Sequence, residues 1–352
     1  MLRSCRARHF RSFTQLGWEP DAAFNSIIGS NASGKTSALE IVSLLASGRS
    51  FRTALLREAI QHGQPCFYLQ GSFAAQSEQT EVQLDRCAHS RKFRVNGQAA
   101  HNPETLLGAI PLLAIAPNTH REFLTEASIR RRFLYWGMFH MEHSFLTQWR
   151  DYGRVLAQRN AQLRRHQAST SVWDVRLVEY GQWLAELAQQ YVACLLPLFR
   201  ETLAALGLRG DSIALRLFRG WEDGEPMAAA LTRANNTDRA LKRTTCGFHR
   251  ADLQISVEGV RAVAFASYGQ QKTIVAALCL AQLKLLLSDH PAAIFLFDDL
   301  PADWDRSTRQ RVLTTIAGLN AVQTFITATE ADLIPERPGR TFHVEQGRLC
   351  AI

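Results

Sequence analysis

The hydrophobic pattern of the first third of the chain is that of short strands around one helix. Stretches such as "CFYLQGSF", "TEVQLDRC" and "KFRVNGQAA" alternate apolar and polar residues, with a turn signal at Asn96 and Gly97. Alternation with a period of two predicts half-buried strands, and Asn-Gly between such runs predicts a hairpin. One stretch, "KTSALEIVSLL", has helical periodicity instead and predicts a helix that begins near Lys35.

From residue 121 to about 206 the pattern changes. Gly and Pro are sparse, and apolar residues recur at helical spacing in "RRRFLYWGMFHMEHSFLTQWRDYGRVLAQRNAQLRR" and "VRLVEYGQWLAELAQQYVACLLPLFRETLAAL". After Arg209 strands return in "SIALRLFRG", "DLQISVEG", "AIFLFDDL", "TFITAT" and "TFHVEQGRL", with helices predicted over 268–288 and 307–319. The sequence therefore predicts an α/β unit that is split by a helical insertion.

Composition and charge narrow the class of protein. No stretch of the 352 residues approaches the ~18 consecutive apolar residues of a membrane span, and no apolar segment follows the arginines near the N-terminus. We therefore expect a cytoplasmic protein. The formal charge of +8 fits a partner with a negative surface, such as nucleic acid. The seven cysteines show no C-x-x-C spacing, so we expect reduced packing residues and neither a zinc site nor disulfides.

A phosphate-binding motif lies between an apolar strand that is predicted to end at Ile28 and the helix that begins near Lys35. The run Gly29-Ser30-Asn31-Ala32-Ser33-Gly34-Lys35-Thr36 fits G-x-x-x-x-G-K-[ST] in the strand-to-helix setting that the motif requires. Small residues allow backbone N–H groups to surround phosphate oxygens, and the helix N-terminus adds its positive dipole end. Lys35 would reach the β- and γ-phosphates, and the Thr36 hydroxyl would bind Mg²⁺.

A second element of such a site is a carboxylate at the end of a buried strand. The string "AIFLFDDL" supplies it. Asp298 would coordinate Mg²⁺ through water, and Asp299 would orient or deprotonate the attacking water. The P-loop and the acidic pair together predict a site for the phosphates of a nucleotide and Mg²⁺.

A third motif indicates the class of ATPase. Ser267-Tyr268-Gly269-Gln270-Gln271 opens a predicted helix upstream of the acidic pair. It resembles the signature motif of ABC-type ATPases, in which Ser and Gly N–H groups contact the γ-phosphate of a nucleotide held by the other subunit. The physical basis is again an anion at a helix N-terminus, here supplied in trans.

Further strings extend the resemblance over nearly the whole chain. "ARHFRSF", "GRSFR", "RRRFLYWGMFH", "LAQRNAQLRR", "GFHRADLQI" and "FHVEQGRL" resemble segments of the RecF family, bacterial recombinational-repair ATPases related to SMC heads. The resemblance implies an α/β, ABC-type (SMC/RecF-like) P-loop ATPase head with an inserted helical arm domain. Its implied parts are an N-terminal head lobe over 1–118, an arm over 119–244 and a C-terminal head lobe over 245–352.

The resemblance also implies roles for individual residues. It places Arg11 near the nucleotide, Ser267, Gly269 and Gln270 on the nucleotide of a second copy, and Asp305 in the loop that links the two copies. Ala32, Tyr268 and Pro301 depart from the family pattern, and an alanine takes positive φ only at a cost. The predicted nucleotide pocket comprises Arg11, Gly29, Ser30, Asn31, Ala32, Ser33, Gly34, Lys35, Thr36, Ser37, Ser267, Gly269, Gln270 and Asp305; catalysis is assigned to Lys35, Asp298 and Asp299, and metal binding to Thr36 and Asp298.

A RecF-like protein is expected to dimerise on ATP, to clamp double-stranded DNA near single-strand gaps and to be released by slow hydrolysis, with RecR, RecO and RecA as partners. A degenerate RecF-like paralogue that acts as a nucleotide-gated scaffold with little hydrolysis is the alternative, and the RecF-like strings argue against an ABC transporter subunit. Candidate contacts to DNA phosphates are Arg49, Arg52, Arg57, Arg130, Arg131, Arg132, Arg164, Arg165, Lys242 and Arg243, of which we expect a subset to bind.

Overall fold

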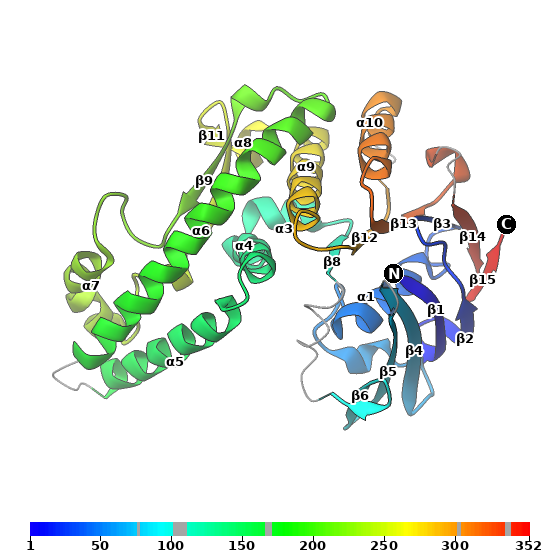
Figure 1. Cartoon of the computed structure of the whole chain (residues 1–352), viewed down its shortest axis with the longest axis horizontal. Coiled ribbons are helices and arrows are strands. Elements are labelled where there is room, and N and C mark those ends of the chain that lie inside the picture. Colours follow the sequence, from blue (N-terminus) through cyan, green and yellow to red (C-terminus); the bar gives the residue numbers. More distant parts are fainter. Residues whose placement is uncertain (76–77, 101–110, 166–170, 301–303, 335–338) are drawn as a thin grey trace. The chain divides into compact units, whose positions relative to one another are not determined.

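Two compact units make up the fold. A computed structural model of the chain describes residues 1–75, 78–100, 111–165, 171–300, 304–334 and 339–352 (Figure 1). Unit 1 comprises Met1–Thr119, Ala205–Gly207 and Leu287–Ile352, and unit 2 comprises His120–Ala204 and Leu208–Leu286. The lobe boundaries suggested by the sequence stay a prediction. The first lies beside the border of unit 1, whereas residues 245–286 pack within unit 2.

Unit 1 contains two six-stranded sheets. The antiparallel sheet has the order β2-β1-β4-β5-β6-β7, and the predicted hairpin at Asn96 and Gly97 is confirmed as the β6–β7 turn. The second sheet has the order β15-β14-β3-β13-β12-β8, in which all neighbours except β14 and β15 are parallel. The strands are β1 (Leu2–Phe10), β2 (Phe13–Trp18), β3 (Phe24–Ile28), β4 (Cys66–Ala75), β5 (Glu78–Cys87), β6 (Arg91–Val95), β7 (Gln98–Ala99), β8 (Leu112–Ile115), β12 (Ala293–Phe297), β13 (Val322–Ala328), β14 (Arg340–Glu345) and β15 (Arg348–Ala351).

One helix is packed against both sheets. α1 (Lys35–Ser47) buries every residue except Thr36, because its apolar residues occur on all sides and share one core with residues of β1, β4, β5, β12 and β13 (Figure 1). A second helix of unit 1, α10 (Arg306–Ala317), is amphipathic and buries Val312, Leu313 and Ile316. The helix predicted at Lys35 is confirmed.

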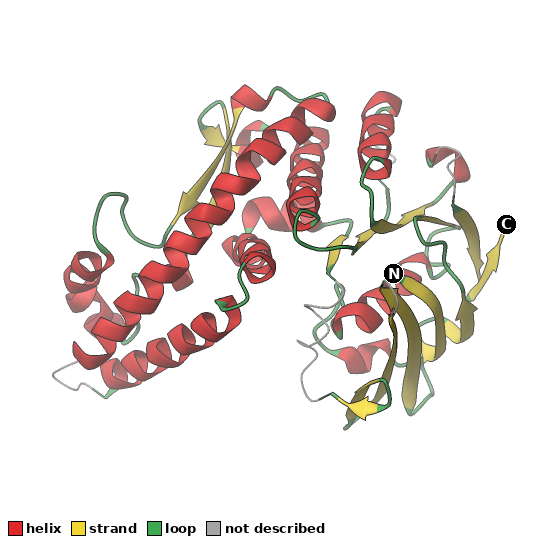
Figure 2. Cartoon of the chain, viewed as in Figure 1, coloured by secondary structure: helices red, strands yellow, loops and turns green. Residues whose placement is uncertain are grey.

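Unit 2 is mainly helical, as the red ribbons of residues 120–286 show in Figure 2. The predicted helical insertion is confirmed, and so is the helix at 268–288, whose central residues are buried. A three-stranded sheet of order β11-β10-β9 completes the unit. Its elements are α3 (Thr119–Thr125), α4 (Ala127–Met141), α5 (Phe145–Arg164), α6 (Ser171–Ala205), β9 (Ile213–Phe218), α7 (Met227–Leu241), β10 (Asp252–Val257), β11 (Val260–Arg261), α8 (Ala262–Phe265) and α9 (Tyr268–Leu286). No helix among the described residues is both long and apolar enough to cross a membrane.

The expectation for the cysteines is wrong for one pair. Cys66 and Cys87 form a disulfide between β4 and β5. They stand directly opposite each other in the antiparallel register, although 21 residues separate them in sequence. Cys194 and Cys350 are free but exposed, so they are not packing residues either. The pairing follows from strand register, which cysteine spacing does not reveal.

A buried ion pair joins two helices of unit 2. The Arg159 guanidinium of α5 donates to Asp238 of α7 at 2.6 Å, and the Arg159 and Asp238 side chains are 1% and 0% exposed. Arg159 also donates to Asp174 at 2.6 Å and to the Thr244 hydroxyl at 2.9 Å. Removing one partner of such a pair leaves a charge buried without compensation.

We therefore expect Asp238→Ala to lower the free energy of unfolding by about 3–5 kcal/mol. The matched control is Glu179→Ala, which removes a carboxylate from an exposed pair with Arg176 and should change it by about 0.5 kcal/mol or less. Urea unfolding followed by circular dichroism measures both variants. Equal effects of the two substitutions would contradict the role of the buried pair.

Candidate functional site

The P-loop connects the end of β3 to the start of α1, as the sequence predicts. Two close approaches explain its glycines. A Cβ on Gly29 would collide with the carbonyl oxygen of Val344, and Gly34 has φ 120° with the Ser12 and Phe13 side chains close by. Glycine is suited to both positions because it lacks the Cβ. The loop therefore places its backbone at the N-terminus of α1, where N–H groups are unpaired within the helix.

The side chains of this loop are arranged for an anion. The Lys35 ammonium donates to the carbonyl oxygens of Gly29 at 2.8 Å and Ser30 at 2.9 Å, and Lys35 is only 7% exposed. Burial lowers the pKa of Lys35, while the nearby carboxylates of Asp299 and Asp298 oppose that shift. The buried hydroxyl of Ser33 has no hydrogen-bond partner among the described residues. A phosphate chain at the loop would satisfy the Ser33 hydroxyl and give the Lys35 charge an anionic partner.

The Asp298 carboxylate lies beside the N-terminus of α1. Its Oδ1 atom accepts a hydrogen bond from the Thr36 hydroxyl at 3.0 Å and another from the Thr327 hydroxyl at 2.8 Å. The three residues come from α1, the end of β12 and the end of β13, and β3, β13 and β12 are neighbours in one parallel sheet. Burial raises the pKa of Asp298, and the two hydrogen bonds counteract this effect. A hydroxyl beside a carboxylate is the oxygen donor set that suits Mg²⁺.

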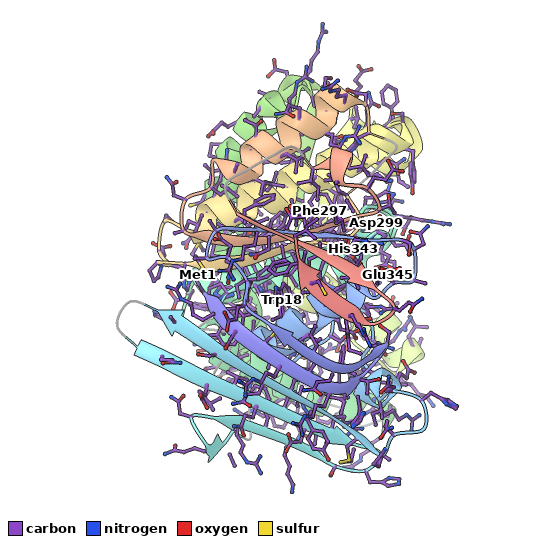
Figure 3. All side chains as sticks on the ribbon, turned by 90° about the vertical axis from the view of Figure 1, so that its right-hand side faces the viewer. Met1, Trp18, Phe297, Asp299, His343 and Glu345 are labelled. Carbon is purple, nitrogen blue, oxygen red and sulfur yellow. A yellow bond between two sulfur atoms is a disulfide. The ribbon has the colours of Figure 1, made fainter. Side chains whose placement is uncertain are left out.

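Asp299 adopts a left-handed backbone conformation. Its φ is 59°, and its N–H donates to the Thr327 hydroxyl at 2.6 Å. The Thr327 hydroxyl therefore fixes both acidic residues, because it donates to the Asp298 carboxylate and accepts from the Asp299 N–H. Figure 3 shows Phe297 and Asp299 at this end of β12. Thr327 belongs to no motif and is one of three polar residues in β13, so nothing in the sequence singles it out.

Ala32 keeps the P-loop in a strained conformation. Its φ is 64°, in the left-handed region that the sequence analysis expected an alanine to enter only at a cost. Ser30 and Asn31 are exposed at the tip of the loop, and Ser37 is buried in the first turn of α1. All of the P-loop residues predicted for the nucleotide thus lie in one continuous loop and helix turn.

Arg11 is held by a carboxylate that the sequence analysis did not select. Its guanidinium donates two hydrogen bonds of 2.9 Å to Glu40, which is fully buried one turn beyond Thr36 in α1. Glu40 also accepts from the Ser50 hydroxyl at 2.6 Å and lies 3.6 Å from Arg52. The charge of Arg52 in turn lowers the pKa of Asp298. A charged residue inside the apolar string "ALEIV" was the sequence signal for this cluster.

The other predicted residues lie at the starts of two helices, α9 and α10. Ser267, Gly269 and Gln270 belong to unit 2, where Ser267 and Gln270 cap α9 reciprocally: the Ser267 N–H donates to the Gln270 side chain at 2.9 Å, and the Gln270 N–H donates to the Ser267 hydroxyl at 3.3 Å. Apart from its chain neighbours and the backbone of its own helix, no atom of the described residues lies within 4 Å of the position that a Cβ of Gly269 would occupy. Asp305 caps α10, and hydrogen bonds from Ser307 and Thr308 lower its pKa. Pro301, Ala302 and Asp303 lie outside the described residues.

Among the described residues, two of the arginines proposed for DNA are paired with carboxylates, and a third, Arg131, donates to the carbonyl oxygen of Ala251 at 3.2 Å. Arg130 is 5% exposed and donates to both carboxylate oxygens of Asp252, at 2.7 and 2.9 Å, and to the carbonyl of Phe123. Its guanidinium is therefore unavailable to a phosphate, which corrects the sequence-based expectation. Arg52 is paired with Glu40, although its side chain is 41% exposed.

Comparisons with known proteins agree in family and fold. A family model described as the RecF/RecN/SMC N terminal domain matches residues 1–347. A protein called "DNA replication and repair protein RecF" from Pseudomonas fluorescens (Pf-5) is 34% identical to this chain, and the alignment covers 96% of this chain and 95% of that protein. A protein of the same name from Marinomonas sp. is 35% identical, and the alignment covers 92% of this chain and 89% of that protein.

Solved structures show the same architecture at lower identity. A structure of "the recombination mediator protein RecF-ATP in RecFOR pathway" superposes with a TM-score of 0.85 at 21% identity, with 100% of this chain and 97% of that chain covered. An SMC head bound to the C-winged helix domain of ScpA gives a TM-score of 0.62 at 13% identity, with 100% and 96% covered. These similarities show the fold of an ABC-type ATPase head.

Thr327→Val tests the hydrogen bonds at Asp298 and Asp299. Valine keeps the volume but leaves the Asp299 N–H unpaired and removes one of the two hydroxyl groups that donate to the Asp298 carboxylate. A lost hydrogen bond to a charged group is worth about 1.5–3 kcal/mol, so we expect ATP hydrolysis to fall roughly tenfold or more. Nucleotide affinity should change little because the P-loop is untouched. Phosphate release and fluorescent-nucleotide titration measure the two quantities. Thr327→Ser retains the hydroxyl and should retain the rate; equal rates for the serine and valine variants would refute the assignment.

Ala32→Gly tests the strain in the P-loop. Relief of a left-handed alanine is worth about 1–2 kcal/mol, and the greater freedom of glycine in the unfolded chain costs about 0.5–1 kcal/mol. We therefore expect the free energy of unfolding to rise by up to about 1 kcal/mol. The control is Ala317→Gly at the exposed end of α10. This substitution should lower the free energy of unfolding, because glycine is less favourable than alanine in a helix. The strain does not exist if both variants are destabilised equally in urea unfolding.

Proposed function

This chain belongs to the RecF family of DNA replication and repair proteins, as its motifs suggested, and we propose that it is an ATP-dependent DNA-binding protein of recombinational repair. Two copies would close around ATP, clamp duplex DNA near single-strand gaps and help to load a recombinase. Slow ATP hydrolysis would then release the DNA. Membership of the family supports the role in repair, and the geometry of the P-loop supports the dependence on nucleotide.

The convergence of Lys35, Thr36 and Asp298 carries the proposal. In the proposed complex, the N-terminus of α1 and the Lys35 ammonium bind the phosphates, so Lys35 exchanges its hydrogen bonds with the Gly29 and Ser30 carbonyls for phosphate oxygens. Thr36 and Asp298 would hold Mg²⁺, which when bound neutralises charge on the phosphates. Asp299 would orient the attacking water, and Thr327 would keep both carboxylates in place.

ATP-dependent pairing would use the start of α9. Ser267, Gly269 and Gln270 of one copy would contact the γ-phosphate held by the other copy. The open space at Gly269 supports this arrangement, since a phosphate group can approach its backbone. A triphosphate that spans two copies binds the closed state better than the open state, which is the condition for a ligand to drive closure.

Charge and relatives support the choice of partners. The formal charge of +8 favours a polyanion, and DNA would be held through its sequence-neutral backbone. The RecF structures similar to this chain are described as belonging to the RecFOR pathway, so RecR, with RecO and RecA, are the proposed protein partners. A cytoplasmic location belongs to the same proposal.

A nucleotide-gated scaffold with little hydrolysis is the second candidate. Two observations favour it: Ala32 strains the P-loop, and the reciprocal cap occupies the Ser267 N–H that would face a phosphate. Both proposals require ATP binding and closure. They differ in the release of phosphate.

Light scattering with a gapped duplex tests the proposal. We expect the molar mass to rise from monomer to DNA-bound dimer when ATP and Mg²⁺ are present, with slow phosphate release. Lys35→Ala should abolish the shift, whereas Lys284→Ala, which removes a lysine paired with Glu201 on the surface of unit 2, should not. A DNA-bound dimer without phosphate release would favour the scaffold. A protein that binds ATP but stays monomeric and ignores DNA would contradict both proposals.

A further inference from the structure

Three arginines meet beyond the C-terminal end of α1 in unit 1. Arg86 of β5 and Arg91 of β6 stand directly opposite each other in the antiparallel register. The Arg91 guanidinium donates to the carbonyl oxygen of Gly48, the residue that ends α1, at 2.7 Å. This hydrogen bond brings Arg91 beside Arg49. We call Arg49, Arg86 and Arg91 the arginine cluster.

The arginine cluster lies on the face of the sheet that packs against α1. Along β5 and β6, Leu84 and Phe93 alternate in phase with Arg86 and Arg91, and both are buried in the core that contains α1. Lys92 and Arg94, at the intervening positions of β6, point to the other face. The α1 face of the β5–β6 pair therefore carries Arg86 and Arg91, whereas Lys92 and Arg94 lie on the other face of β6.

Within the described residues, no carboxylate neutralises the arginine cluster. Among the described residues, none of its members forms an ion pair with a carboxylate, and the buried Nε of Arg86 has no hydrogen-bond partner. Burial, and then the charges of Arg86 and Arg49, lower the pKa of Arg91. Like charges directly opposite each other in a sheet are destabilising.

The end of α1 compensates for part of this charge. The carbonyl groups at a helix C-terminus favour a nearby cation, and the hydrogen bond to Gly48 uses one guanidinium in this way. One capping interaction explains Arg91 alone. It leaves unexplained why Arg86 and Arg49 add two further positive charges that have no acidic partner in the described part of the chain.

An oxyanion would compensate for the remaining charge. Arg49 and Arg91 are exposed and Arg86 is half-buried, so an anion can reach all three from solvent. Guanidinium groups bind phosphate with paired N–H donors and do not lose their charge. α1 has 13 residues and is therefore about 20 Å long, which places the arginine cluster at the opposite end of the helix from Lys35. A nucleotide held at the P-loop cannot supply the anion.

We propose that Arg49, Arg86 and Arg91 bind a phosphate group of the DNA backbone. The proposal rests on the proposed function, because it assigns to unit 1 a contact with the duplex that the closed protein holds. The exposure of Arg49 and Arg91 suits a polymer that passes over the surface, and contacts to phosphate alone leave binding independent of sequence.

The test compares duplex binding by two double variants of the full chain. Arg49→Gln with Arg91→Gln removes the two exposed members and keeps the half-buried Arg86. The matched control, Lys92→Gln with Arg94→Gln, removes the same charge from the opposite face of β6. Affinity for a duplex is measured with ATP and Mg²⁺ over a range of salt concentrations.

We expect the cluster variant to lose affinity roughly tenfold near 0.1 M salt and its log–log salt slope to fall by about 1, the value for one phosphate contact. The control should keep the slope of the parent. Nucleotide affinity should be the same in all three proteins, because the P-loop is at the other end of α1.

The outcomes separate this inference from the proposed function. If the parent binds no duplex with ATP, the proposed function fails. If the parent binds and the two variants lose the same affinity, the effect is one of general charge and the assignment of the arginine cluster is wrong. A thermal-shift titration with inorganic phosphate completes the test. Stabilisation of the parent but not of the cluster variant, with duplex binding equal in both, would show a site for free phosphate and overturn the assignment to DNA.

Discussion

The hydrogen bonds that Asp298 accepts from Thr36 and Thr327 are the interaction on which the site depends. They join the first turn of α1 to the ends of two neighbouring parallel strands, β12 and β13. In a parallel sheet the carboxyl ends of all strands meet at one edge, so a loop after β3 and a carboxylate after β12 come together although some 260 residues separate them. The buried carboxylate is tolerated because two hydroxyl groups donate to it.

The burial of α1 gives this site a rigid support. Nearly every residue of the helix is buried, and two of its polar side chains form hydrogen bonds with other elements. Thr36 contacts Asp298, and Glu40 one turn later binds Arg11 and Ser50. At its far end the helix meets the arginine cluster. A packed helix moves as one body, so the geometry at one end is fixed relative to the other.

Local patterns in the sequence were sufficient for several parts of the molecule. The P-loop, the acidic pair and the hairpin at Asn96 and Gly97 each depend on residues that are adjacent in the chain, and the structure has the corresponding loop, strand end and turn. The helical insertion followed from periodicity over about eighty residues. Membership of the RecF family followed from strings that the comparisons confirm over nearly the whole length.

The tertiary structure decided which distant residues meet. Thr327 and Glu40 belong to no motif, and their roles follow from the neighbours that sheet order and helix packing give them. The same is true of the Cys66–Cys87 disulfide, the pairing of Arg130 with Asp252 and the crowding of Arg86 and Arg91. Sequence by itself determined the elements and the local motifs, because these depend on short-range backbone and capping chemistry. Contacts between elements depend on register and packing across the whole chain, which no short window of sequence contains.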